Sequence, residues 1–267
     1  MARLQRIFPD PMAAHSLRRW AQMGACAGLL VALVYFAPAA WLASAIAAAS
    51  DQRVLLADAR GTVWSGSARL VLTGGQDSQD AAVLPERVQW TLRPRGLGVQ
   101  AALLVQCCSR QAAMVHTQAL WGGARLDISA LQLQLPAAVL SGLGTPWNTL
   151  GLDGSLQLSS DQLGAQINEG RVQFSGSAVL DMEHIASPLS TLRPLGDYRL
   201  SLQGGAVPRI DLQTLQGALL LSGSGEWAGN RLRFNGEASA TPEREAALSN
   251  LLNIIGRRQG ARSLITL

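Results

Sequence analysis

An uncharged stretch from Trp20 to Ser50 constrains this chain more than any other feature. A helix needs about 20 apolar residues to cross the hydrocarbon core of a bilayer, and Met23–Ala43 supplies them. Before this stretch stand a single acid, Asp10, and four arginines: Arg3, Arg6, Arg18 and Arg19. Basic residues beside a membrane span stay in the cytoplasm, so we expect the N-terminus to lie inside the cell.

The chain therefore divides into three parts. We predict a basic cytoplasmic tail over residues 1–20, a transmembrane anchor over 21–45 and a domain delivered across the membrane over 46–267, as in a single-pass membrane protein. The side chains predicted to hold the anchor in lipid are Trp20, Leu29, Leu30, Val34, Tyr35 and Trp41. A signal peptide cleaved near Ala47–Ala49 is the alternative. We rank it second because the apolar core of a signal peptide has only about 7–15 residues.

Charge and composition exclude two broad classes. Once the basic tail is set aside, acids and arginines nearly balance, so the net charge of +4 does not indicate nucleic-acid binding. With 48% hydrophobic residues the chain can bury a real core, and disorder is not expected.

Short runs with alternating apolar residues follow the anchor, separated by glycine-rich turns. The clearest is Val88–Leu92, in which Val88, Trp90 and Leu92 share one face. About a dozen such runs predict a mainly β fold, a large antiparallel meander that forms a twisted sheet, a sheet curled into a trough, or a two-sheet body. A proline-bounded loop at residues 187–194 is the predicted seam if the domain has two halves.

Three segments share a tryptophan, a glycine and an Arg-Leu pair: Trp64–Leu70, Trp121–Leu126 and Trp227–Leu232. Each pattern predicts a strand that ends in a large aromatic residue, a glycine turn, and a new strand that opens with an exposed arginine. We expect these tryptophans to be core anchors and not platforms for a ligand.

The C-terminus departs from the β pattern. Thr241 and Pro242 are typical of a helix start, and one apolar stripe follows at Leu248, Leu251, Leu252 and Ile255. We predict a short amphipathic helix that ends near Gly256, and then a last strand over Ser263–Leu267. The helix either plugs one end of the β domain, which we favour, or binds anionic lipid with the help of Arg257 and Arg258.

No arrangement of residues indicates catalysis or metal binding. The three histidines lack metal-ligand spacing, the sequence has no nucleophile elbow or phosphate-binding loop, and without lysine it cannot form a Schiff base. Cys107 and Cys108 are adjacent in a predicted strand, where neighbouring side chains point to opposite faces. We therefore favour free thiols over a vicinal disulfide. We expect a protein that is not an enzyme and needs no cofactor or metal.

Several segments, in this order, resemble the type II secretion system protein N family. They are GTVWSG at Gly61–Gly66, PLGDYRL at Pro194–Leu200, GSGEW at Gly223–Trp227 and the tail from Leu251 to Leu267. The resemblance implies an inner-membrane accessory of the machine that moves folded proteins from the periplasm through an outer-membrane secretin. It implies as partners the inner-membrane platform, the secretin or both, and it carries no catalytic residue over to this chain.

Ten residues are predicted to act in structure or interaction: Gly61, Trp64, Gly66, Trp90, Tyr198, Trp227, Leu248, Leu252, Arg257 and Arg258. The alternative function is a β-groove that binds or transfers lipid, as in AsmA-like and lipopolysaccharide-bridge proteins. Alternating strands with apolar residues along one face would suit such a trough, and lipid would then be the partner.

Overall fold

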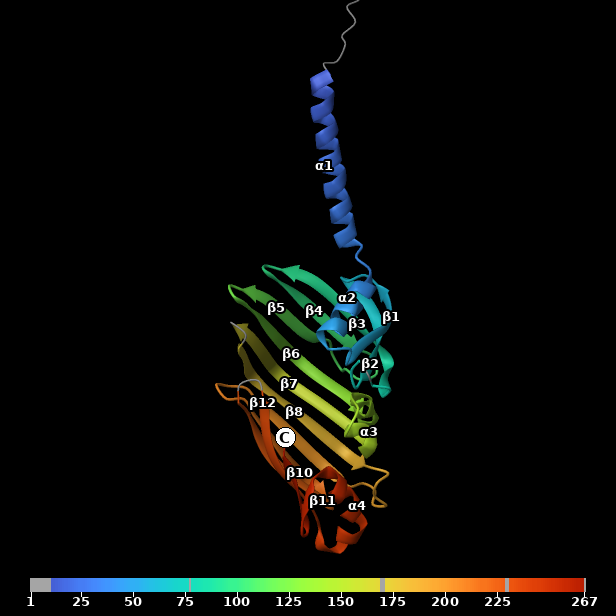
Figure 1. Cartoon of the computed structure of the whole chain (residues 1–267), viewed down its shortest axis with the longest axis vertical. Coiled ribbons are helices and arrows are strands. Elements are labelled where there is room, and N and C mark those ends of the chain that lie inside the picture. The colour runs from blue at the N-terminus through green and yellow to red at the C-terminus, as the bar shows by residue number, and fades with distance from the viewer. Residues whose placement is uncertain (1–10, 77, 169–170, 229–230, 267) are drawn as a thin grey trace, which may run out of the picture.

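The computed structural model describes residues 11–76, 78–168, 171–228 and 231–266 (Figure 1). Over these residues it contains one antiparallel sheet of 14 strands, in the order β1 to β12 followed by β14 and β13. Each strand from β1 to β12 thus pairs with its neighbours in the chain, as expected for a meander. The sheet stays open, with β1 and β13 as its two edges.

The first seven strands are β1 (Val54–Gly61), β2 (Ser65–Thr73), β3 (Ala81–Arg95), β4 (Gly98–Val105), β5 (Ala113–Leu120), β6 (Gly123–Pro136) and β7 (Asp153–Asn168). The last seven are β8 (Arg171–Ala186), β9 (Gly196–Gln203), β10 (Arg209–Gly217), β11 (Leu219–Ala228), β12 (Arg231–Ala240), β13 (Arg257–Gln259) and β14 (Arg262–Thr266). The helices are α1 (Pro11–Tyr35), α2 (Ala39–Ala49), α3 (Trp147–Leu150) and α4 (Glu245–Ile255), with 3₁₀ turns η1 (Ala137–Leu143) and η2 (Pro242–Arg244). The loop at residues 187–194 connects β8 to β9, and the sheet is continuous across it.

The segment predicted as one transmembrane helix over residues 21–45 is two helices, so that prediction is wrong on this point. Pro38 has no backbone N–H and disfavours a helical conformation at Ala37, which separates α1 from α2. Ala37 and Pro38 pair instead with the turn between β1 and β2. The amide of Val63 donates to the carbonyl of Ala37 (2.8 Å), and Pro38 bridges to Thr62.

Within the described part of the chain, no helix combines the length and the apolar character needed to cross a membrane.

The helices other than α1 lie against one face of the sheet, which we call the inner face. Figure 1 shows α1 projecting from one end of the sheet, while α2, α3 and α4 follow its right-hand side. Three clusters of buried side chains join α2, η1 and α4 to this face. The opposite, outer face carries no helix among the described residues.

The C-terminal helix forms as predicted and plugs the last part of the sheet. Leu248, Leu251 and Leu252 are almost fully buried, and they pack with Leu156 and Tyr198 from the inner face. Burial of this stripe supports the predicted plug, because the three leucines face the sheet and not a lipid surface.

The three tryptophan segments lie at hairpin turns, as predicted. Trp64 follows β1, Trp121 follows β5 and Trp227 lies near the end of β11. The expected core role is wrong for Trp121, which is fully exposed, because it lies in the turn beyond the last strand pair, Leu120 and Gly123.

Candidate functional site

The turn between β1 and β2 fastens α1 to the sheet, and we call this contact the joint. The indole Nε1–H of Trp64 donates to the carbonyl of Val34 in the last turn of α1 (2.8 Å). The carbonyl of Trp64 accepts a bond from the amide of Leu92 on β3 (2.6 Å). Because the last carbonyl groups of a helix have no partner within the helix, Trp64 caps α1 while it is tied to the sheet.

Close packing explains the glycines at the two ends of this turn. Gly61 has a φ of +90°, a conformation that favours glycine. A Cβ atom on Gly66 would lie 2.6 Å from the ring of Trp90. Trp90 is buried with Ala39 of α2, and its Nε1–H donates to the carbonyl of Val63 (3.0 Å). The predicted residues Gly61, Trp64, Gly66 and Trp90 therefore come together at the joint.

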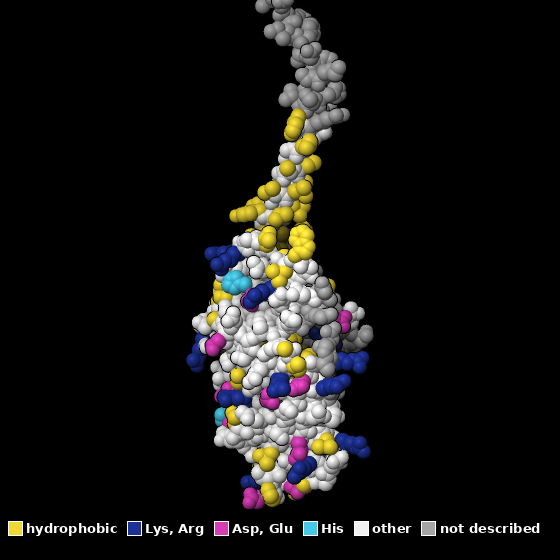
Figure 2. Space-filling view, turned by 90° about the vertical axis from the view of Figure 1, so that its left-hand side faces the viewer, with side chains coloured by type: hydrophobic (Ala, Val, Ile, Leu, Met, Phe, Trp, Pro, Cys, Tyr) yellow, Lys and Arg dark blue, Asp and Glu magenta, His cyan; other side chains and the backbone are white. Residues whose placement is uncertain are grey.

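The predicted anchor side chains lie on α1 and α2 and are largely exposed. Those exposed by more than half are Trp20, Leu29, Leu30, Val34 and Tyr35, and on α2 also Trp41. Figure 2 shows apolar side chains along the part of α1 nearest the body, whereas charged side chains of both signs are scattered over the body itself. The N-terminal helix thus presents an apolar surface that nothing in the described chain covers.

The sheet is amphipathic, because cross-strand partners share a face. On the outer face one row of partners runs through Arg93, Gln100, His116 and Asp127. On the inner face the adjacent row runs through Leu92, Ala101, Val115, Ile128 and Leu163. The polar face is turned to solvent, and the apolar face is the one on which the helices lie.

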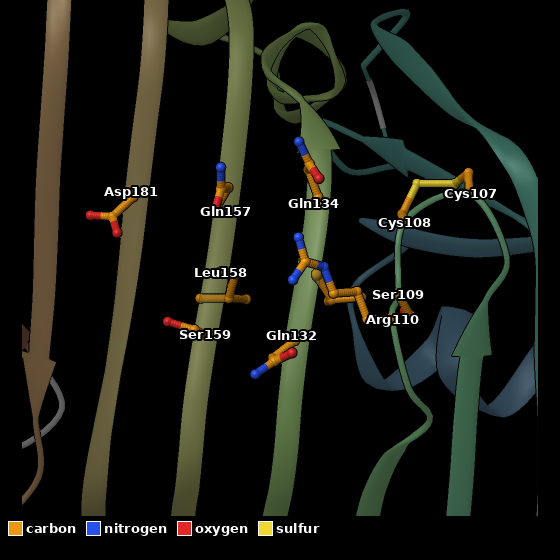
Figure 3. Close-up of a pocket in the computed structure, with 11 residues that line it drawn as sticks. Cys107, Cys108, Ser109, Arg110, Gln132, Gln134, Gln157, Leu158, Ser159 and Asp181 are labelled. Atoms are coloured by element: carbon orange, nitrogen blue, oxygen red, sulfur yellow. A yellow bond between two sulfur atoms is a disulfide. The ribbon is translucent and has the colours of Figure 1, made fainter.

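A cavity of about 300 Å³ opens on the outer face (Figure 3). Its lining runs from the loop after β4 to β8 and comprises Cys107, Cys108, Ser109, Arg110, Gln132, Leu133, Gln134, Gln157, Leu158, Ser159 and Asp181. Asp181 forms a bidentate ion pair with Arg199 (2.6 and 2.9 Å), and this pair raises the pKa of Arg199. Amide, hydroxyl and paired charged groups of this kind suit hydrogen bonding to a polar surface.

Cys107 and Cys108 form a vicinal disulfide, so the expectation of free thiols is wrong. The rule of alternating faces applies to strands, but β4 ends at Val105 and the two cysteines lie in a turn, where the amide of Cys108 donates to the carbonyl of Val105 (2.9 Å). Cys108 packs in the cluster under η1, whereas Cys107 is exposed.

The remaining predicted residues lie apart from the joint and hold the far half of the sheet together. Tyr198 is buried, its hydroxyl donates to the carbonyl of Leu219 (3.2 Å), and burial raises the pKa of its phenol. Trp227 packs against Phe174, with ring centroids 6.1 Å apart and the ring planes tilted by 51°. Leu248 and Leu252 lie on the buried side of α4 and are part of the core between this helix and the sheet.

The C-terminal arginines divide between structure and surface. Arg258 donates to Glu245 at the start of α4 (3.0 Å) and to the carbonyl of Gly260 (2.6 Å), so it ties β13 to the helix. Arg257 is exposed. In the described residues no three His, Cys, Asp or Glu side chains are grouped as metal ligands.

Two features were missed by reasoning from the sequence. The cap that Trp64 provides for α1 joins residues 30 positions apart, and no local pattern encodes such a contact. The apolar inner face was only partly visible, because paired irregularities in β6 and β7, near Ala130, interrupt the alternation that reveals a face.

Comparison with known proteins adds one finding. A family model described as type II secretion system (T2SS), protein N, matches residues 52–264, while searches of curated proteins and of solved structures found no match. The matched region covers well over half of the chain and nearly all of the sheet. The chain therefore belongs to the type II secretion system protein N family.

Proposed function

We propose that the protein is a non-catalytic scaffold of the type II secretion system, held at the inner membrane by its N-terminal helix, with the sheet in the periplasm. In this role it supports the export of folded proteins across the outer membrane. The observation that carries the proposal is the joint. There, hydrogen bonds from Trp64 to Val34 and from Val63 to Ala37 fix an apolar helix to a large sheet.

The chemistry of α1 supports attachment to a membrane. No charged residue lies between Trp20 and Phe36, a length of about 25 Å in a helix, and the side chains described there are exposed and mostly apolar. Arg18 and Arg19 precede this stretch in the sequence, where long basic side chains reach lipid headgroups on the cytoplasmic side.

The open edges of the sheet support a role in recruiting partners. A peptide that adds to a sheet needs a free strand edge of useful length. β13 is a short edge of three residues that carries two arginines, a type of edge that resists pairing. β1 has eight residues, so we place the docking of another secretion component along Val54–Ala57, before the register irregularity in β1.

Topology and secretion assays in cells test this function. A reporter that is active only in the periplasm should be active when fused after Leu267 and inactive when fused before Met1. Deletion of the gene should reduce release of a type II substrate, and the protein should copurify with platform or secretin components. Normal secretion and normal complex assembly in the deletion strain would refute the scaffold role.

A point variant gives a sharper test of the joint. Trp64→Ala removes the cap on α1 and should lower secretion while the protein remains in the membrane. Trp147→Ala, which changes an indole on α3 away from the joint, is the matched control. Equal secretion by the two variants would argue against a role for the joint.

A further inference from the structure

Two rows of apolar side chains cross the inner face outside the three buried clusters. The first row links Val115, Ile128 and Leu163 by direct cross-strand pairing. The second row links Ala178, Leu202 and Ile210. Leu163 pairs with Gly176, which lies two residues from Ala178 on the same strand face, so the rows form one continuous apolar strip from β5 to β10.

No helix among the described residues covers this strip. Val115, Ile128, Leu163, Leu202 and Ile210 belong to none of the three clusters that α2, η1 and α4 complete, and each remains half-buried. The sheet curls over the strip, since Phe174 of β8 and Trp227 of β11 approach to 6.1 Å between ring centroids although two strands separate β8 from β11 in the sheet.

On the same face, the next row toward the end of the sheet from which α1 projects runs through Val99, Thr117, Leu126 and Ala165, so one hydroxyl interrupts an otherwise apolar path. At that end the β3–β4 and β5–β6 turns carry Leu97, which is 81% exposed, and Trp121, which is fully exposed. The two turns are neighbours, because the amide of Ala119 donates to the carbonyl of Leu97 (3.2 Å). Figure 1 shows the tips of β4 and β5 at the end of the sheet nearest α1.

We propose that the strip binds an acyl chain of a phospholipid that enters past Leu97 and Trp121 from the membrane at α1. The paired residues of both rows are uncharged and apolar, so they match hydrocarbon and offer no side-chain partner to a polar ligand. The source of the lipid rests on the proposed attachment of α1 to the membrane, whereas the acyl-chain site itself goes beyond the scaffold function.

Photocrosslinking tests the site. Full-length protein is reconstituted in vesicles of phosphatidylethanolamine and phosphatidylglycerol that contain a phosphatidylethanolamine with a diazirine near the end of one acyl chain. After illumination, adducts are mapped by peptide mass spectrometry. Adducts are expected on α1 and on the strip peptides of β6 and β7.

Matched variants on β7 make the test specific. Leu163→Asp puts a carboxylate into the strip and should lower the strip adducts by about tenfold or more, with α1 adducts unchanged. The neighbour Gln162 pairs with Ser129 on the outer face. Gln162→Asp should therefore change neither the strip adducts nor the α1 adducts. Leu163→Trp fills the strip without adding charge and should also lower strip adducts, which settles the test if the aspartate variant fails to fold.

The outcomes show whether the acyl-chain site, or both this site and the attachment of α1 to the membrane, must be abandoned. Adducts on α1 alone would overturn the acyl-chain site and leave membrane attachment standing. Adducts on neither would overturn both proposals. Strip adducts that a folded Leu163→Trp protein retains in full would show that the lipid binds elsewhere on the sheet, and would also overturn the site.

Discussion

Replacement of Trp64 by phenylalanine should loosen the joint without unfolding the sheet. The variant keeps most of the aromatic ring but loses the bond of 2.8 Å to the carbonyl of Val34. One hydrogen bond contributes about 0.5–1.5 kcal/mol net, which corresponds to a rise of about 2- to 12-fold in the equilibrium constant for local opening. The lower half of this range is expected, because a carbonyl at a helix end can regain a water molecule when the indole is absent.

Hydrogen exchange measures this opening directly. The amide of Val63 donates to the carbonyl of Ala37, so it exchanges when the joint opens and should exchange about 2- to 5-fold faster in Trp64→Phe. The amide of Leu212 in β10 should not change, and Trp147→Phe should leave Val63 as in the wild type. Unchanged exchange at Val63 would refute the inferred cap. An equal increase at Leu212 would mean that the variant weakens the whole sheet.

Three further predictions concern the core, an acid-sensitive contact and the disulfide. Leu252→Ala should lower the free energy of unfolding in urea by about 2–5 kcal/mol because Leu252 is fully buried, whereas Ile254→Ala, on the exposed side of α4, should change it by about 0.5 kcal/mol or less. The His184 amide and the Gln216 side chain lower the pKa of Asp197, so its carboxylate stabilises the fold above pH 3.8 and this contribution is lost as the pH falls through the lowered pKa. The melting temperature of Asp197→Asn should therefore fall less steeply in acid than that of the wild type, and parallel curves would contradict this. Thiol titration of denatured protein should find only Cys26 without reductant, and also Cys107 and Cys108 after reduction; three free thiols from the start would contradict the vicinal bond.

Local patterns predicted the parts of the fold that depend on local chemistry. The C-terminal helix was readable from its start signal at Thr241-Pro242 and from the leucine stripe, because both act within a few turns of helix. The strands were readable where alternation is regular, as in Val88–Leu92. A meander followed from short spacings and abundant glycine, since antiparallel neighbours need only tight turns.

The errors came from contacts between distant segments and from the positions at which strands end. The break between α1 and α2 depends on Pro38, but it is held by Thr62 and Val63, which the sequence of the helix does not contain. The disulfide between Cys107 and Cys108 was missed because β4 ends at Val105, so the rule of alternating strand faces does not apply to these two residues. Trp121 resembled the other turn tryptophans, yet it lies beyond the last pair of its hairpin and finds no core to enter.

Pairing in chain order has a consequence for how such a protein reaches its final form. From β1 to β12 each new strand needs only the one before it, so most of the loops to be closed are short and their entropic cost is small; the longest connection is residues 137–152, between β6 and β7. A chain that emerges amino end first could therefore build its sheet progressively, each strand serving as the template for the next. Completion would wait for α4 and β14, which arrive last and cover the end of the growing structure.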